Sequence, residues 1–406
     1  MLNTLYLQYR GLPKNIILLF LFEFTISLVH VAFILILNIY LRKQGFSDPE
    51  IASFNSLRFI GALLFSLPLG IYIRDKKLKQ FFIISSISIS LTSILIIESI
   101  QYQMIPLIKL AFFLWGLGMM FMRVCSLPFI IRNTTSNNNS EAISLSAATW
   151  SLATIVAGII ISGLDWIYAI NIFNISFSFD EKGILRLITV MSFCSLIFAK
   201  KINEDSFDNV AFPKEEFSLK KSYNWKLIFK AISPLVLISI GAGLTIPFVN
   251  LFFNSVFNLS SSQFSIMGSI TAFLVFFSSL MVPILKRRYG YWLTIVLVQS
   301  LAIICLVIMS LTELFASYPL AFYVAIIAYI FRQPLMHMAH PSSNEFMMNY
   351  VGKKNQELIS ALSSSLWSAS WFISAKIFEW LRLLNFKYYE IFLITAGLYV
   401  FGVILY

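Results

Sequence analysis

The stretch Leu69-Gly70-Ile71-Tyr72-Ile73-Arg74-Asp75-Lys76-Lys77-Leu78-Lys79 is short and strongly basic, carries a single carboxylate and lies between two long apolar runs. In a membrane protein, such a turn indicates a cytoplasmic hairpin between two transmembrane helices. The composition agrees with this interpretation, because 58% of the 406 residues are hydrophobic and only 12% are charged. A soluble fold cannot bury that much apolar surface, so lipid must solvate much of the chain.

The apolar runs divide the chain into twelve segments, each long enough to cross a bilayer. Only helices fit this length and pattern, because lipid offers the backbone no hydrogen-bond partners. The first run is too long for a signal-peptide core and lacks a small-residue cleavage site. The predicted spans are 15–41, 49–73, 79–101, 104–131, 142–168, 184–202, 228–256, 262–285, 291–312, 318–346, 357–381 and 387–406.

The distribution of basic residues predicts the orientation. With the N-terminus inside, 19 of the 30 lysines and arginines lie in inner segments, 8 lie at outer ends and 3 lie within spans. This bias predicts a multi-pass protein of the cytoplasmic (inner) membrane with both termini in the cytoplasm. The net charge of +11 is then explained by topology signals and contacts with anionic lipid, and we expect no nucleic-acid partner.

The two parts of the chain are related by an offset of about 213 residues. At this offset Asp75 corresponds to Arg288, and at 212 Asn38 corresponds to Asn250. Several such matches in the same order predict two six-helix halves with the same orientation. The expected domains are an N-terminal half over 1–203, a polar cytoplasmic linker over 204–226 and a C-terminal half over 227–406.

The first hairpin resembles the loop signature of the major facilitator superfamily. Gly70, Asp75, Lys76 and Lys79 match the pattern of a glycine, an aspartate and basic residues, and the run 286–290 resembles the same loop in the second half. The resemblance implies an all-α integral membrane fold of twelve transmembrane helices in two pseudo-symmetric six-helix halves. It also implies alternating access, with a small-molecule solute bound between the halves and no cofactor.

The resemblance further implies a cytoplasmic gate, in which the loop aspartate bonds to the neighbouring helices. Asp75 and Arg132 are 57 residues apart, as are Arg288 and Glu345 with the signs reversed. The alternative is a solvated surface turn that contributes little beyond topology. The expected gate residues are Gly70, Asp75, Lys76, Lys79, Arg132, Arg287, Arg288 and Glu345.

Ionisable residues inside the membrane are costly and therefore mark functional sites. Glu23, Ser27 and His30 share one face of the first span, because they are spaced by four and three residues. Glu23 is the first candidate for proton coupling. His30 is the second, since an unperturbed imidazole titrates near neutrality. The alternative role for Glu23 is a structural salt bridge with Arg58 or Arg123.

Three arginines within the spans, Arg58, Arg123 and Arg332, are suited to an anionic group of a solute, or alternatively to pairing between helices. His337 and His340 lack further ligands, so we expect no metal site. Asn250, His337, Trp367 and Trp371 complete the set of substrate-cavity candidates.

These observations favour a secondary active transporter over an enzyme, since no nucleotide-binding loop and no catalytic cluster are present in the sequence. The expected partners are a small solute, a proton or other ion, and lipid, and we expect a monomer. The buried arginines favour uptake of a nutrient or organic anion. The first-span carboxylate and the aromatic content of 16% favour efflux of amphipathic compounds. A non-transporting receptor on the same fold is a third alternative. We also expect a short basic tail beyond Tyr406.

Overall fold

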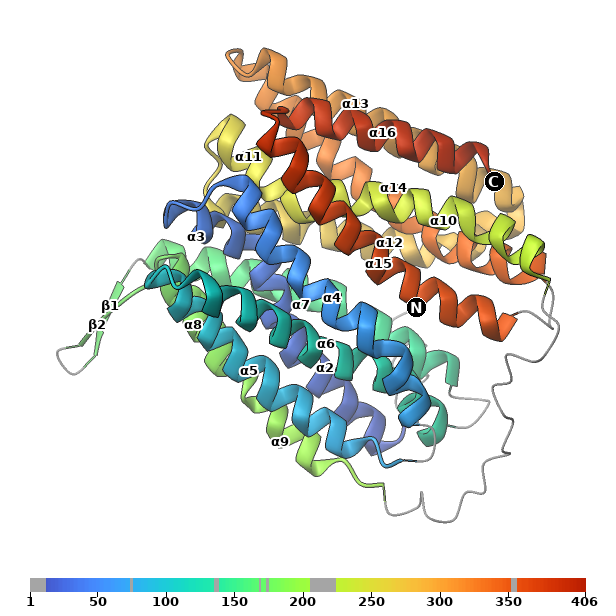
Figure 1. Cartoon of the computed structure of the whole chain (residues 1–406), viewed down its shortest axis with the longest axis horizontal. Helices are drawn as coiled ribbons and strands as arrows, with labels where there is room; N and C mark the ends of the chain where they lie inside the picture. The colour runs from blue at the N-terminus through green and yellow to red at the C-terminus, as the bar shows by residue number, and fades with distance from the viewer. Residues whose placement is uncertain are drawn as a thin grey trace. The chain divides into compact units, whose positions relative to one another are not determined.

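The computed structural model describes residues 12–73, 76–134, 139–167, 169–172, 175–204, 224–351 and 356–406. These residues form twelve helical segments and one β-hairpin, which confirms the predicted spans and their order (Figure 1). The segments are α2 (Lys14–Ala32) with η1 (Phe33–Leu37) and α3 (Asn38–Lys43), α4 (Asp48–Tyr72), α5 (Lys79–Gln101), α6 (Ile105–Asn133), α7 (Asn139–Ile167), α8 (Glu181–Ser192) with α9 (Cys194–Lys201), α10 (Trp225–Thr245) with η3 (Ile246–Phe248) and α11 (Val249–Phe257), α12 (Ser261–Tyr291), η4 (Trp292–Leu297) with α13 (Val298–Leu311) and η5 (Thr312–Phe315), α14 (Pro319–Val351), α15 (Gln356–Leu383) and α16 (Tyr388–Ile404).

Within the described ranges, nine helices are long and apolar enough to cross a membrane by length and composition, and α16 is a shorter apolar helix. Local sequence explains several helix ends. Glu50 accepts hydrogen bonds from the backbone N–H and the hydroxyl of Ser47 at the start of α4. Ser260 and Gln263 form a reciprocal capping box at the start of α12. Gly290 has a φ of +73° and breaks the helical path within α12, one residue before its end.

The hairpin was not predicted. Strands β1 (Ala169–Ile172) and β2 (Ile175–Ser178) pair in antiparallel register, with Ala169 opposite Ser178. The two strands follow α7 in the chain and project away from the neighbouring helices (Figure 1). Both strands are short, and β2 alternates apolar with polar residues, which is the period of a strand, whereas β1 contains one polar residue, Asn171. The segment separates two predicted spans, and a four-residue strand is easily overlooked beside the much longer apolar helices.

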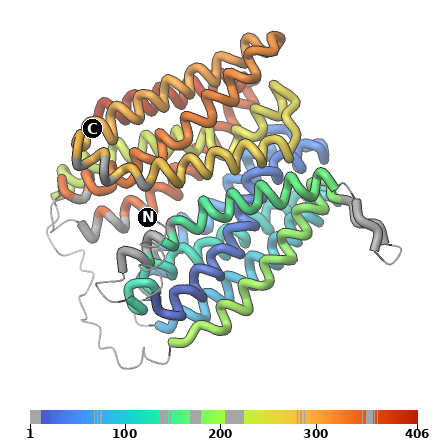
Figure 2. Tube along the Cα trace, turned by 180° about the vertical axis from the view of Figure 1, so that it is seen from behind, coloured from blue at the N-terminus to red at the C-terminus, as the bar shows by residue number. Residues whose placement is uncertain are grey.

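The described chain forms two compact units. The first unit comprises residues 12–37 and 60–204. In it α2 packs against α7, and α5 packs against α6, α8 and α9. Figure 2 shows these helices from behind as long, closely packed rods. The ring of Phe82 contacts those of Phe22 and Phe129, so aromatic packing ties α2, α5 and α6 together.

The second unit comprises residues 38–59 and 224–406. Here α10 packs against α15 and α16, and α14 packs against α12 and α13. The segment 38–59 belongs to this unit through buried amides. Asn38 Nδ2 donates to the carbonyl oxygen of Pro247 at 2.6 Å and to Asn250 Oδ1 at 3.3 Å, and Asn55 Nδ2 donates to Asn38 Oδ1 at 2.9 Å.

Candidate solute and proton site

The first unit contains a cavity of about 340 Å³ that opens between α2, α6 and α7. It holds two of the residues singled out in the sequence, the acidic Glu23 and the basic Arg123. The other lining residues are uncharged. The cavity is lined by Glu23, Ser27, Met122, Arg123, Ser126, Leu127, Ile130, Ser146, Thr149 and Trp150.

Glu23 is buried on α2, with 6% of its surface exposed. Ser146 Oγ donates to Glu23 Oε2 at 2.7 Å. Ser126 lines the same cavity, and its hydroxyl donates to the carbonyl oxygen of Met122 at 2.9 Å. The sequence left open a salt bridge between Glu23 and Arg123. In the described part of the first unit, the hydrogen-bond partner of Glu23 is the hydroxyl of Ser146, and Glu23 forms no ion pair with Arg123.

Arg123 instead contacts His30, whose Nε2 lies 3.4 Å from Arg123 Nη2. His30 is buried, and its ring stacks on Trp115 with the ring centres 5.2 Å apart. The ring of Trp150 also lies against the imidazole, at an angle of 63° and with the ring centres 4.9 Å apart. The structure thus brings both proton-coupling candidates and one arginine candidate to one site.

The other candidates belong to the second unit. Arg58 is buried and its guanidinium carbon lies 4.7 Å from the centre of the Phe59 ring. Arg332 is 1% exposed, and its Nη2 donates to the hydroxyl of Tyr399 at 3.3 Å. Asn250 is buried and accepts from the backbone N–H of Leu251 as well as from Asn38.

The aromatic candidates of α15 lie close to one another. The rings of Trp367 and Trp371 are 5.9 Å apart, and Trp371 also meets the edge of Phe59. His340 meets the ring of Trp367, while His337 is exposed on α14. Among the described residues, no group of three or more histidine, cysteine or carboxylate side chains is placed to hold a metal ion.

The gate candidates of the first unit centre on Arg132. Its guanidinium donates to the carbonyl oxygens of Ile73 and Lys76 at 3.0 and 2.8 Å, which ties the end of α6 to the basic loop between α4 and α5. Asp75 lies outside the described residues. Gly70 is exposed near the end of α4. Glu204, which sequence reasoning missed, accepts from the backbone N–H of Leu78 and Lys79 at the start of α5.

In the second unit, the ion pair among the gate candidates is not the pair of Arg288 and Glu345 that the repeat indicated. Glu345 forms an ion pair with Lys286 and accepts from the hydroxyl of Tyr291 at 3.0 Å. Arg288, the residue that the offset matched to Asp75, lies over the ring of Tyr289. Nothing is described of the Arg287 side chain.

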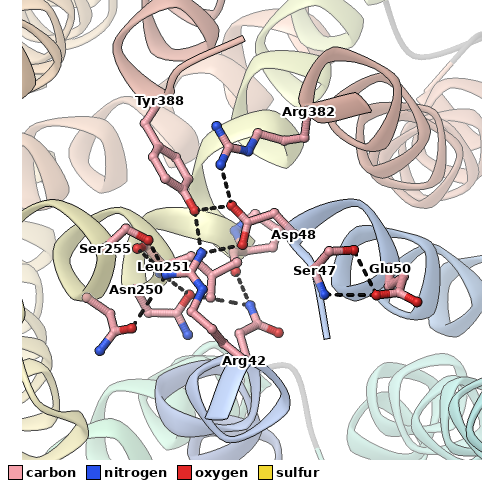
Figure 3. Close-up of polar contacts among 12 residues, drawn as sticks. Arg42, Ser47, Asp48, Glu50, Asn250, Leu251, Ser255, Arg382 and Tyr388 are labelled. Atoms are coloured by element: carbon pink, nitrogen blue, oxygen red, sulfur yellow. Dashed lines mark hydrogen bonds and ion pairs between the residues drawn. The ribbon is translucent and has the colours of Figure 1, made fainter. Parts of the chain in front are cut away.

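The second unit contains a further charged cluster that the sequence did not predict. Its arginines were counted only among the basic residues at the outer ends of the spans. Asp48 is 7% exposed and pairs with both Arg42 and Arg382. The hydroxyl of Tyr388 donates to Asp48 and accepts from Arg42 (Figure 3). Arg42 also donates to the carbonyl oxygen of Leu251, so the cluster joins α3, α4, α11, α15 and α16. No local pattern reveals such a set, because its members lie far apart in the chain.

Comparison with solved structures supports the same fold. The nucleoside transporter NupG aligns with a TM-score of 0.70 and 14% identity, over 97% of this chain and 98% of that one. A bacterial homologue of the iron transporter ferroportin in an inward-facing state gives 0.70 and 13%, over 96% and 98%. A bacterial homologue of the human lysosomal transporter Spinster, inward-facing and unoccupied, gives 0.68 and 12%, over 96% and 95%.

At these identities the likeness shows the fold alone. No curated protein sequence matches the chain. The family itself is shown by sequence, because the family model described as Major Facilitator Superfamily matches residues 16–375. The basic loops in the sequence, the twelve helical segments and this match agree, and the chain therefore belongs to the major facilitator superfamily of membrane transporters.

Proposed function

We propose that this protein is a proton-coupled secondary transporter that moves a small polar solute with an anionic group by alternating access. The observation that carries the proposal is the cavity of the first unit, which combines the buried carboxyl group of Glu23 with the guanidinium-bearing side chain of Arg123. A proton site and an anion site in one cavity are the chemistry that coupled transport of an organic anion requires.

Glu23 supplies the proton site. Its partner Ser146 is suited to both protonation states, because a hydroxyl can donate to a carboxylate and accept from a carboxylic acid. A change of surroundings during the transport cycle changes the proton affinity of such a group, and that change links proton binding to conformation.

Arg123 supplies the anion site. Arg123 lines the cavity, and one of its nitrogens contacts a neutral acceptor rather than a carboxylate. A guanidinium with donors to spare binds carboxylate or phosphate oxygens through charge-assisted hydrogen bonds.

Efflux of amphipathic compounds is the second candidate, favoured by the apolar part of the same cavity. Met122, Leu127, Ile130 and Trp150 form a surface on which an aromatic or aliphatic group can pack. The cargoes named for the structural neighbours, nucleosides and iron, differ from one another and select neither candidate. Loop charge supports a cytoplasmic membrane location with both termini inside.

Flux measurements in proteoliposomes test the proposal, after a thermal-shift screen of organic anions and amphipathic compounds on the purified protein. A pH gradient should drive the transport of a screened anionic solute. Glu23→Gln should abolish the gradient-driven flux and spare solute exchange, while Arg123→Gln should weaken solute binding. Glu98→Gln is the matched control, because Glu98 is paired with Arg186 outside the cavity and should behave as wild type. Full gradient-driven flux in Glu23→Gln would refute the proton site, and a preference for uncharged amphipathic cargo would favour efflux.

A further inference from the structure

His30 and Glu23 offer Arg123 two alternative partners. On α6, Ser126 lines the same cavity as Glu23, while Trp115 stacks on His30. Arg123 lies between these two residues in the sequence of α6, one turn from Ser126. Glu23 and His30 are two turns apart on one face of α2. Along the helix axes, the guanidinium of Arg123 therefore lies between the carboxyl group of Glu23 and the imidazole of His30.

The structure shows which partner it takes. Arg123 Nη2 is 3.4 Å from His30 Nε2, and Glu23 accepts a hydrogen bond from the hydroxyl of Ser146. Because arginine can only donate, Nε2 must be the acceptor, and the imidazole is then the neutral tautomer with its proton on Nδ1. The orientation of this ring decides where the guanidinium points.

A chain of contacts holds the imidazole in that orientation. Trp115 packs flat against both His30 and Phe33, with interplanar angles of 13° and 9°. The indole N–H of Trp115 donates to Ser93 Oγ at 3.0 Å, which anchors the ring to α5. With Trp150 at its edge, His30 has little room to rotate.

We propose that His30 is a positioning residue that holds Arg123 away from Glu23, so that the carboxyl group remains able to exchange a proton. A guanidinium within ion-pair distance strongly favours the ionised form of a carboxyl group. Among the lining residues that the structure describes, Arg123 is the only charged one besides Glu23, and those from α7 are neutral. Without His30 as acceptor, the released donor of Arg123 finds its best remaining partner in Glu23.

This inference rests on the proposed role of Glu23 as the proton site, and the experiment separates the two. Infrared difference spectroscopy of the purified full-length protein, titrated with acid, reports the carboxyl band of a buried glutamic acid. The band that Glu23→Gln removes is assigned to Glu23. If Glu23→Gln removes no band over the accessible pH range, the proton site itself is refuted, and the positioning role with it.

Four variants then test the role of His30 alone. His30→Phe keeps an aromatic ring against Trp115 but has no acceptor, and it should move the Glu23 titration to lower pH by about 1 to 3 units, the range for a carboxyl group beside an arginine. His30→Leu removes the acceptor without a ring and serves if the first variant does not fold. His30→Gln keeps an acceptor near the position of Nε2 and should titrate close to wild type. The double variant His30→Phe/Arg123→Gln should also return to the wild-type midpoint.

An unchanged midpoint in His30→Phe or His30→Leu would overturn the proposal. A shift of equal size in His30→Gln would overturn it too, because the acceptor would then not be the cause. Thr25→Val is the matched control on α2, since the hydroxyl of Thr25 donates to carbonyl oxygens of its own helix and lies outside the cavity lining. A purely structural role for His30 would lower thermal stability in every variant without moving the Glu23 titration.

Discussion

The guanidinium of Arg382 lies 2.8 Å from the carboxylate of Asp48, and Arg42 contacts the other carboxylate oxygen. One buried acid thus pairs with two arginines, which come from opposite ends of the chain and meet in the second unit. Such a cluster is sensitive to loss of its acid, because both cations would remain partly buried, each 23% exposed, without this counter-charge.

We therefore expect Asp48→Asn to lower the free energy of unfolding by about 3 kcal/mol, near the lower end for breaking a buried pair because the arginines are partly exposed. Denaturant unfolding in detergent measures the loss. Glu50→Gln is the control, since Glu50 accepts from Ser47 at the exposed start of the same helix. Equal stability of the two variants would contradict the central place of Asp48 in the cluster.

A second prediction follows from the close packing of α10 against α15 at Gly243. A Cβ on Gly243 would lie 2.6 Å from Ser374 Cβ and 3.2 Å from the backbone of Trp371, so Gly243→Ala must push two helices apart. Overpacking of this kind costs about 1 to 3 kcal/mol. Gly397→Ala on α16 is the matched control, because its Cβ would meet nothing within 4 Å. We expect thermal unfolding to occur at lower temperature in Gly243→Ala and at the wild-type temperature or above in Gly397→Ala.

The third prediction concerns the ion pair of Glu345. Because its partner is Lys286, Glu345→Gln and Lys286→Gln should slow solute flux to a similar extent, while Arg288→Gln should have a smaller effect. The pair is partly exposed, so its coupling free energy in a double-mutant cycle of stability should stay below about 1 kcal/mol. Wild-type flux in all three variants, at equal membrane content, would leave the pair with no gating role.

Glu204 caps α5 from outside the helix. Its two carboxylate oxygens accept from the N–H groups of Leu78 and Lys79, both at a helix start where backbone donors lack partners within the helix. Glu204→Ala should cost about 1 kcal/mol, as for other lost N-terminal caps. Hydrogen exchange should accelerate at these amides. The exposed Asp165 at the end of α7 is the control site, and Asp165→Ala should leave exchange in α5 unchanged.

Much of the architecture was predictable from the sequence. The length of the apolar runs, the loop charges and the offset of about 213 residues are properties of neighbouring residues or of the chain's own repetition, and lipid permits little except helices for such runs. The same reasoning marked Glu23, His30 and Arg123, because an ionisable side chain within an apolar run stands out without any knowledge of its partner.

Partner choice was decided by the tertiary structure alone. The sequence could offer Arg123 as a salt-bridge partner of Glu23, but the packing of α2, α5 and α6 places an anchored imidazole within its reach. The repeat offset matched Arg288 to the gate, whereas Lys286 meets Glu345. Nothing in the sequence indicated that Asp48 contacts Arg382 and Tyr388. Side chains pair according to helix rotation and rotamer, which depend on packing between segments far apart in the chain, and no local pattern encodes these.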